Sequence, residues 1–222
     1  MLVQAVLKVV LVDVNPAVVR AWQTIFADSP EVQIVQGSIL DQRVDAWVTP
    51  TNAQGSMNGG LDAVLKRHFG ASIEQSVQKE IRRLYGGHLP VGCAVCVPTG
   101  WSVPRFLIST PTMVASVENI SETHNVALAC AAAFQAIHQQ NRTGEGSITA
   151  VALPGLGART GGVPVLTCAR LMWTAYNLFN DYEFRNFDTM RAALAEHLDT
   201  LTSGSDETRL RIQLPPNNDW LQ

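Results

Sequence analysis

The fold of this chain is decided by the stretch Val44-Asp45-Ala46-Trp47-Val48-Thr49-Pro50-Thr51-Asn52-Ala53-Gln54-Gly55-Ser56-Met57-Asn58-Gly59-Gly60-Leu61-Asp62. Its apolar beginning predicts a buried strand that breaks at Pro50, and a loop rich in glycine and asparagine follows. A helix is predicted to begin near Asp62, because the following apolar residues have the spacing of one helical face: Leu61, Val64, Leu65, His68 and Phe69. The first turn of a helix has unpaired N–H groups, and Gly59 and Gly60 let the backbone come close to a ligand, so this loop is suited to bind phosphate.

A second stretch has the same layout. Ile148 to Leu153 is typical of a buried strand, and it is followed by the loop Pro154-Gly155-Leu156-Gly157-Ala158-Arg159-Thr160-Gly161-Gly162-Val163-Pro164, whose last residue stands where a helix would begin. In an open α/β sheet, such loops meet in the crevice at the carboxyl ends of the strands. We therefore expect the first glycine loop (residues 52–62) and the second glycine loop (residues 154–164) to face one shared site.

The rest of the chain also alternates between strands and helices. Strands are expected at 7–13, 32–35, 91–98 and 106–109, and 110–113 is expected to be a strand-end loop that could also face the crevice. Helices are expected after Asn15-Pro16, at 72–84, after Glu122 or Thr123, after Pro164 and within 181–200. This alternation is typical of α/β proteins.

The two glycine loops resemble those of the macro domains, a family that binds ADP-ribose. The family typically has an Asp before the strand, then Asn-Ala-Ala-Asn, four residues, four glycines, a small apolar residue and Asp. Here the aligned residues, without a gap, are Thr49-Pro50-Thr51-Asn52, Ala53 to Ser56, Met57-Asn58-Gly59-Gly60, Leu61 and Asp62. The second loop is similar to the family pattern of Pro, small, aliphatic, Gly, Thr, Gly, two variable residues, Gly, apolar and Pro. The resemblance covers roughly residues 32 to 180, and the first loop looks most like macro proteins of bacteria and their phages.

The resemblance implies a single three-layer α/β/α domain with a central mixed sheet. We place this macro-like domain at residues 1–200 and a C-terminal tail at 201–222, in which Arg209 to Leu214 alternate like one added strand. A chain of 222 residues, 46% of them hydrophobic, can bury one core of this size.

The resemblance also implies a site for ADP-ribose, a related nucleotide diphosphate or an ADP-ribosylated substrate. The positions that align with the family's ligand contacts are Ser38, Ile39, Thr49, Thr51, Met57, Asn58, Gly59, Gly60, Leu61, Gly155, Leu156, Gly157, Ala158, Arg159, Thr160 and Gly161. In the hydrolytic branch of the family, the residues aligned with Asn52 and Asp62 hold the distal ribose and orient the attacking water, which implies an ADP-ribosylhydrolase or an O-acetyl-ADP-ribose deacetylase.

Other interpretations of the same residues stay open. Asp62 could serve only at the N-terminus of its helix, and Asn52 could merely shape the turn. The protein could then be a non-catalytic module that reads or sequesters ADP-ribose. It could also be an enzyme that acts on another phosphorylated nucleotide.

Four positions depart from the family pattern. Thr49 replaces the first Asn, so the contacts of that Asn must be replaced or absent. Ser38 replaces an Asp that accepts a hydrogen bond from the adenine amine, and an uncharged hydroxyl predicts a weaker preference for adenine. Arg159 stands where the family has Gly, and its guanidinium either points outward or binds the diphosphate. Gly161 stands where an aromatic residue often covers the distal ribose, which predicts a more open site.

Composition and charge argue against several other classes. A net charge of −3 gives no basic surface, so direct nucleic-acid binding is not expected. Apolar runs stay well short of the ~20 residues of a membrane span and the N-terminus lacks the features of a signal peptide, which favours a cytoplasmic protein without membrane contact.

The cysteines and histidines predict neither a metal site nor a cofactor. Cys93 and Cys96 have the C-x-x-C spacing of zinc sites, but on the predicted strand they would point to opposite faces, and no second Cys/His pair completes the set. Cys130 and Cys168 lie on apolar helix faces, which indicates packing. The five histidines form no constellation.

Overall fold

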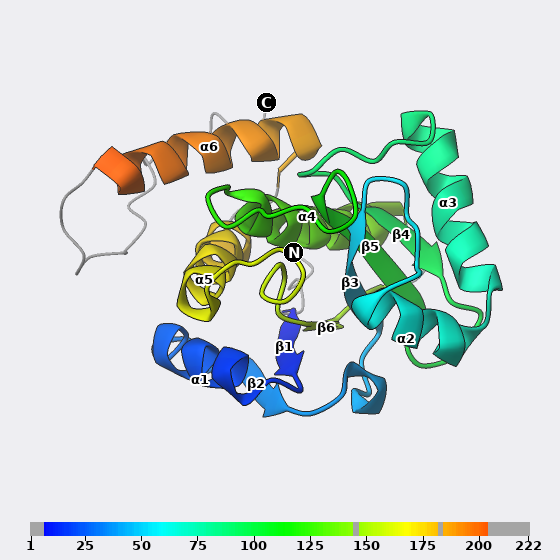
Figure 1. Ribbon diagram of the computed structural model, residues 1–222, viewed down its shortest axis with the longest axis horizontal. Coiled ribbons are helices and arrows are strands. Elements are labelled where there is room, and N and C mark those ends of the chain that lie inside the picture. Colours follow the sequence, from blue (N-terminus) through cyan, green and yellow to red (C-terminus); the bar gives the residue numbers. More distant parts are fainter. Residues whose placement is uncertain (1–6, 144–146, 182–183, 204–222) are drawn as a thin grey trace, which may run out of the picture.

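The computed structural model describes residues 7–143, 147–181 and 184–203, and a single mixed sheet lies at its centre (Figure 1). The six strands are β1 (Lys8–Asp13), β2 (Val32–Gln36), β3 (Ala46–Asn52), β4 (Val95–Pro98), β5 (Phe106–Met113) and β6 (Ala150–Leu153). Their order in the sheet is β2-β1-β6-β3-β5-β4. All neighbouring strands are parallel except β4 and β5, which are antiparallel.

Helices cover both faces of this sheet (Figure 1). Two of them, α2 (Gly60–Phe69) and α3 (Ser72–Tyr85), pack on one face. The opposite face carries α1 (Pro16–Ile25), α4 (Asn125–Thr143), α5 (Val165–Asp181) and α6 (Phe187–Ser203). Alternation along β1 explains the two cores, because Val9 and Leu11 join the second set of helices while Val10 and Val12 join the first set. The prediction of a three-layer α/β/α domain with a mixed sheet is confirmed.

Two strands run further than predicted. β3 continues through Pro50 to Asn52, so the prediction that Pro50 breaks the strand was wrong. β6 pairs with β3 only at Ala46 and Trp47, and the missing N–H of Pro50 therefore removes no ladder bond on that side. The extension of β3 gives β5 a partner, and residues 110–113 are strand rather than the expected loop.

The C-x-x-C pair lies differently from the prediction. β4 begins at Val95, so Cys93 precedes the strand and the argument from opposite strand faces was wrong. Cys93, Cys96, Cys130 and Cys168 are all free thiols, and Cys130 and Cys168 are buried in the core as expected. Within the ranges given above, no group of His, Cys, Asp and Glu side chains could hold a metal ion.

The C-terminal part of the domain ends in a long helix. α6 runs through Ser203, past residue 200 where we placed the end of the domain, and the strand expected at 209–214 lies outside the described residues. None of the helices in the described part of the chain is long and apolar enough to cross a membrane.

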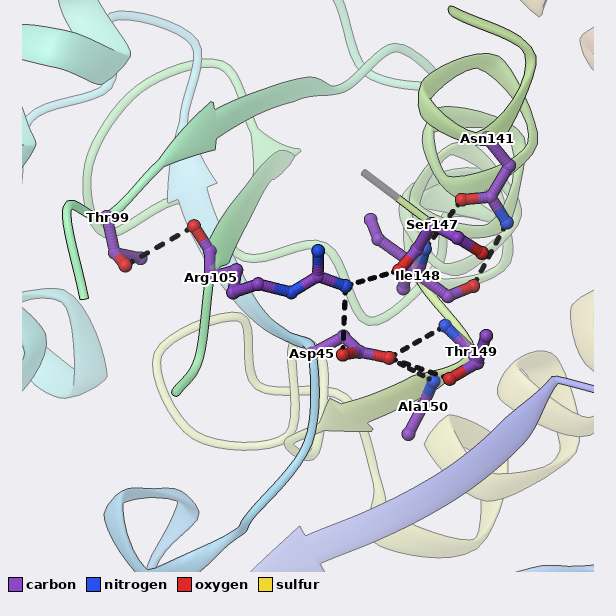
Figure 2. A network of polar contacts seen from close by, with 8 residues as sticks. All are labelled: Asp45, Thr99, Arg105, Asn141, Ser147, Ile148, Thr149 and Ala150. Atoms are coloured by element: carbon purple, nitrogen blue, oxygen red, sulfur yellow. Dashed lines mark hydrogen bonds and ion pairs between the residues drawn. The ribbon is translucent and has the colours of Figure 1, made fainter. Parts of the chain in front are cut away.

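One carboxylate, that of Asp45, connects the starts of three strands, β3, β5 and β6, by hydrogen bonds and an ion pair (Figure 2). Asp45, directly before β3, accepts hydrogen bonds from the Thr149 N–H at 2.8 Å, the Thr149 hydroxyl at 2.9 Å and the Ala150 N–H at 3.0 Å. The guanidinium of Arg105, directly before β5, forms an ion pair with Asp45 at 3.0 Å and also donates to the Ser147 carbonyl. Burial acts to raise the pKa of Asp45, but these hydrogen bonds outweigh it and lower the pKa below its usual value.

Candidate functional site

A cavity of about 680 Å³ opens at the carboxyl ends of the strands. Its walls come from the ends of β1, β2, β3 and β5 and from both glycine loops. Its volume lies within the range of small-molecule sites. The cavity lies at the carboxyl ends of β6 and of its neighbours β1 and β3. Open α/β sheets bind their ligands at such strand ends.

Most of the residues predicted for the site line this cavity. They are Ser38, Ile39, Thr51, Asn52, Asn58, Gly59, Gly60, Leu61, Asp62, Gly155, Gly157, Arg159, Thr160 and Gly161. Four expected ligand residues do not line it: Thr49, Met57, Leu156 and Ala158. The first three are buried with at most 1% exposure, and Ala158 packs against the core.

Sequence reasoning missed several residues of the cavity wall. They include Val12, Asp13, Val14, Gly37, Ser56, Ser116 and Val117, while Thr112 and Met113 face the cavity as the expectation for 110–113 allowed. Asp13 ends β1 and Gly37 follows β2, so the rule that strand ends meet could have found both. Ser116 and Val117 belong to a connection without a recognisable motif.

Asp62 is a buried carboxyl in the wall of the cavity. It lies in the first turn of α2 and is 7% exposed, and the Thr49 hydroxyl donates to its Oδ1 at 2.5 Å. Burial raises the pKa of Asp62 to about 7; the hydrogen bond from Thr49 and the hydroxyl of Thr51 oppose this effect, while the negative charge of Glu74 adds to it. Near neutral pH the carboxyl therefore occurs both with and without its proton, as a general acid or base requires.

The environment of Asp62 also explains the departure at Thr49. The Thr49 side chain is 1% exposed and holds the carboxyl from below the cavity. The N-cap residue of α2 is Gly59, and the hydrogen bond described for Asp62 comes from the Thr49 hydroxyl rather than from a helix N–H group. Helix capping therefore accounts poorly for Asp62.

Asn52 shapes the first glycine loop. Its Oδ1 accepts hydrogen bonds from the N–H groups of Gln54 at 3.0 Å and Ser56 at 3.2 Å. Its Nδ2 donates to the Ser116 hydroxyl at 3.1 Å, which joins the loop to the connection after β5. The structural interpretation of Asn52 is thus supported, although Asn52 and Ser116 both line the cavity.

An ion pair next to the cavity fixes the middle of the first glycine loop. Glu74 on α3 accepts a hydrogen bond from the Met57 N–H at 2.7 Å and pairs with Lys66 at 2.5 Å. Lys66 also donates to the Asn58 Oδ1 at 3.1 Å. The hydrogen bond from Lys66 is the largest of the influences that lower the pKa of Glu74, so Glu74 keeps its negative charge. That charge in turn helps to raise the pKa of Asp62.

The glycines of the two loops have different physical roles. In the second loop Gly157 has a φ of 74°, and a Cβ there would lie 2.8 Å from Val126, so Gly157 is required for packing. A Cβ on Gly161 would lie 2.7 Å from Ile120, so the backbone leaves no room for a side chain at that point, and the more open site stays a prediction. Gly59, in contrast, has a φ of −146° and nothing within 4 Å of an added Cβ.

Arg159 supplies a positive charge to the cavity. Its side chain is exposed and lines the wall of the second glycine loop. In the part of the chain that the structure describes, no carboxylate pairs with it. A free guanidinium beside two glycine loops is suited to bind a phosphate group.

Known proteins share this architecture. The Macro domain family model matches residues 48–172, which include both glycine loops. An uncharacterized protein of Aquifex aeolicus is 32% identical over 142 residues, which are 64% of this chain and 78% of the relative. The macrodomain of Mycobacterium tuberculosis DarG superposes with a TM-score of 0.55 at 23% identity over 66% of this chain and 90% of its own.

A second solved structure carries a ligand. It is a mutant Oceanobacillus iheyensis macrodomain with ADPR, and it superposes with a TM-score of 0.53 at 18% identity over 76% of this chain and 91% of its own. Similarity at this level concerns the fold. The family model, however, matches more than half of the 222 residues, and this chain belongs to the macro domain family.

Proposed function

We propose that the cavity binds ADP-ribose or a close relative, with the diphosphate held between the two glycine loops. The observation that carries this proposal is the meeting of both loops on one cavity of about 680 Å³. The first loop offers the N-terminus of α2 behind Gly59 and Gly60, and the second offers the Arg159 guanidinium. Membership of the macro domain family supports the same ligand.

Calorimetric titration with ADP-ribose, AMP and NAD tests this proposal directly. Gly59→Glu places a carboxylate where the diphosphate would lie, and we expect the Kd for ADP-ribose to rise more than tenfold, about 1.4 kcal/mol. The φ of −146° at Gly59 accepts any residue, so the variant should fold. Gly59→Ala is the matched control, because its Cβ meets nothing within 4 Å. An unchanged Kd in folded Gly59→Glu contradicts the phosphate placement, and a wild type that binds no ADP-ribose overturns the proposal.

We further propose that the site hydrolyses an ADP-ribosyl bond. A water oxygen would bond to the anomeric carbon of the distal ribose while the bond to the leaving group breaks, and the leaving group keeps the electron pair. The Asp62 carboxylate would accept the proton of that water, and a pKa of about 7 suits this role near neutral pH. Asn52 would exchange its bond to Ser116 for one to a ribose hydroxyl. In an O-acetyl-ADP-ribose deacetylase the same water would attack the carbonyl carbon of the acetyl group; the bond from that carbon to the ribose oxygen would break, acetate would leave, and the ribose oxygen would keep the electron pair and take up a proton.

A non-catalytic reader of ADP-ribose is the second candidate, and the contacts of Asn52 favour it. Both ends of the Asn52 amide are engaged by the protein itself, at Gln54, Ser56 and Ser116. A residue with these contacts holds the loop in place and contributes little to binding or orienting a substrate. Release of ADP-ribose from modified protein, modified nucleic acid or acetylated substrate distinguishes the two, because a reader binds ADP-ribose without releasing it.

A further inference from the structure

One end of the cavity lies where β1 and β2 end, far from Asp62. Asp13, Val14, Gly37, Ser38 and Ile39 line this end. The sheet order β2-β1-β6-β3 separates the two ends by three strand intervals, about 14 Å at ~4.8 Å each. If the proposed function holds, a ligand with its diphosphate on the loops and its distal ribose near Asp62 has its base at the β1–β2 end.

Ser38 is poorly placed to act as an acceptor for that base. Its hydroxyl oxygen already accepts a hydrogen bond from the Leu40 N–H at 3.2 Å, as the N-cap of the short 3₁₀ helix Ile39–Asp41. The hydroxyl still has one O–H to donate, and its one remaining lone pair is uncharged. A carboxylate in the cavity would therefore be a stronger acceptor than Ser38 for an exocyclic amine on the base.

Asp13 supplies such an acceptor. Its Oδ1 accepts from the Asn15 N–H at 2.8 Å and its Oδ2 from the Gly155 N–H at 3.1 Å, so two backbone donors fix the plane of the carboxylate. A carboxylate accepts up to about four hydrogen bonds, so capacity is left for a ligand. The Asp13 carbonyl bonds to the Gly37 N–H at 3.0 Å, which places Asp13 next to the residue before Ser38. Among the described residues, no Lys or Arg pairs with Asp13.

We propose that Asp13 is the base-selecting residue of this site. Its carboxylate accepts a hydrogen bond from the exocyclic amine of adenine, and the Ser38 hydroxyl donates to the ring nitrogen beside that amine. Hypoxanthine presents a carbonyl oxygen in place of the amine and an N–H in place of the ring acceptor. Both contacts are then mismatched. Asp13 therefore gives the site a preference for adenine that Ser38 alone would not provide.

The test compares ADP-ribose with inosine diphosphate ribose by calorimetry. A hydrogen bond to a charged acceptor predicts that the wild type binds ADP-ribose roughly 10- to 100-fold more tightly. In Asp13→Asn, whose amide can present either a donor or an acceptor, the ratio should fall below about threefold. Asp41→Asn is the matched control, because Asp41 is an exposed carboxylate on the adjoining 3₁₀ helix and does not line the cavity.

The ratio of the two affinities separates selectivity from folding, because both ligands meet the same preparation. If Asp13→Asn fails to fold, Asp13→Ser is measured in its place, since a hydroxyl can still accept one of the two backbone hydrogen bonds. A ratio near one in the wild type, or a ratio that persists in a folded Asp13 variant, overturns the inference and leaves the proposed function intact. A wild type that binds neither nucleotide overturns both.

Discussion

Asp45 precedes β3, whereas Asp62 lies in α2 and contacts Thr49 of β3, and their surroundings give these two carboxyls opposite acid–base behaviour. Asp45 accepts two N–H bonds, a hydroxyl and an Arg105 guanidinium, and its pKa is lowered despite burial. Asp62 accepts a hydrogen bond from the Thr49 hydroxyl, and in the described part of the chain no cation pairs with it, so burial raises its pKa to about 7. The difference teaches that burial and the donors around a carboxyl decide together whether it keeps its charge, because Asp62 is the more deeply buried of the two and has fewer donors.

The two carboxyls also differ in the property of the protein that they affect. The contacts of Asp45 join the starts of β3, β5 and β6, so this carboxylate stabilises the sheet (Figure 2). The raised pKa of Asp62 costs stability above neutral pH, and such a cost is typical of functional sites. Substitution of each residue should therefore affect a different property.

The largest expected effect is on catalysis. Asp62→Ala should lower turnover of an ADP-ribosylated substrate by roughly 10²- to 10⁴-fold, the usual loss for a positioned acid–base group. The affinity for ADP-ribose should stay within about tenfold, because the contacts to the diphosphate are left in place. Asp45→Ala should leave the turnover of folded molecules unchanged.

Melting and turnover measured on the same preparation decide between roles for Asp62. If Asp62 only supports the helix, Asp62→Ala costs roughly 0.5 to 2 kcal/mol of stability without a specific loss of rate. A wild type that binds ADP-ribose but releases none from any substrate would support the reader, with the Asn52 contacts to Ser116 as the reason.

The next effect is on the pH dependence of stability, and it has opposite signs for the two residues. The folded pKa of Asp62, about 7, lies above its reference value of 3.8, so the stability contributed by its proton is fully present below about pH 4 and is lost as the pH rises to 7. At 1.36 kcal/mol per pKa unit the loss is on the order of 4 kcal/mol. Asp62→Asn imitates the protonated form and should remove this loss, making the variant more stable than the wild type at pH 8.

For Asp45 the folded pKa is lowered, so its contribution is present above about pH 4 and is lost as the pH falls below that. Asp45→Asn should therefore destabilise the protein at pH 7 by about 1–3 kcal/mol, the cost of weakening hydrogen bonds to a charged group. Urea unfolding of the wild type and both variants from about pH 2.5 to pH 8 measures the two effects. Parallel curves for wild type and Asp62→Asn over this range would contradict the raised pKa.

The sequence was sufficient to predict the fold and the place of the site, because strand alternation and loop glycines are local features. It was not sufficient to predict which residues of a loop turn inward. Met57 and Leu156 stand within aligned motifs but are buried, since the path of each loop is set by contacts with distant residues such as Glu74 and Cys168.

Contacts between distant residues also explain the other misses. The bond between Thr49 and Asp62 gives an otherwise unexplained threonine a role, and no spacing rule contains that pair. Asp13 approaches Gly155 although most of the chain separates them; the end of its strand indicates the cavity, but its contact with the second glycine loop depends on the strand order. Pro50 was misjudged because the neighbours of a strand, which decide whether proline is tolerated, are not visible in its own sequence.

The smallest expected effect concerns the charge next to Asp62. Glu74 raises the pKa of Asp62 through its negative charge, so Glu74→Gln should move the pH midpoint of Asp62-dependent turnover downward and change the rate by less than about fivefold at any pH. The Gln carbonyl can still accept the bond from the Met57 N–H, so the loop should keep its shape. Glu80→Gln is the matched control, because Glu80 lies on the same helix and pairs with Arg83 at the surface. Equal midpoints for Glu74→Gln and Glu80→Gln would show that the hydrophobic burial of Asp62 and its threonine partners determine its pKa without help from Glu74.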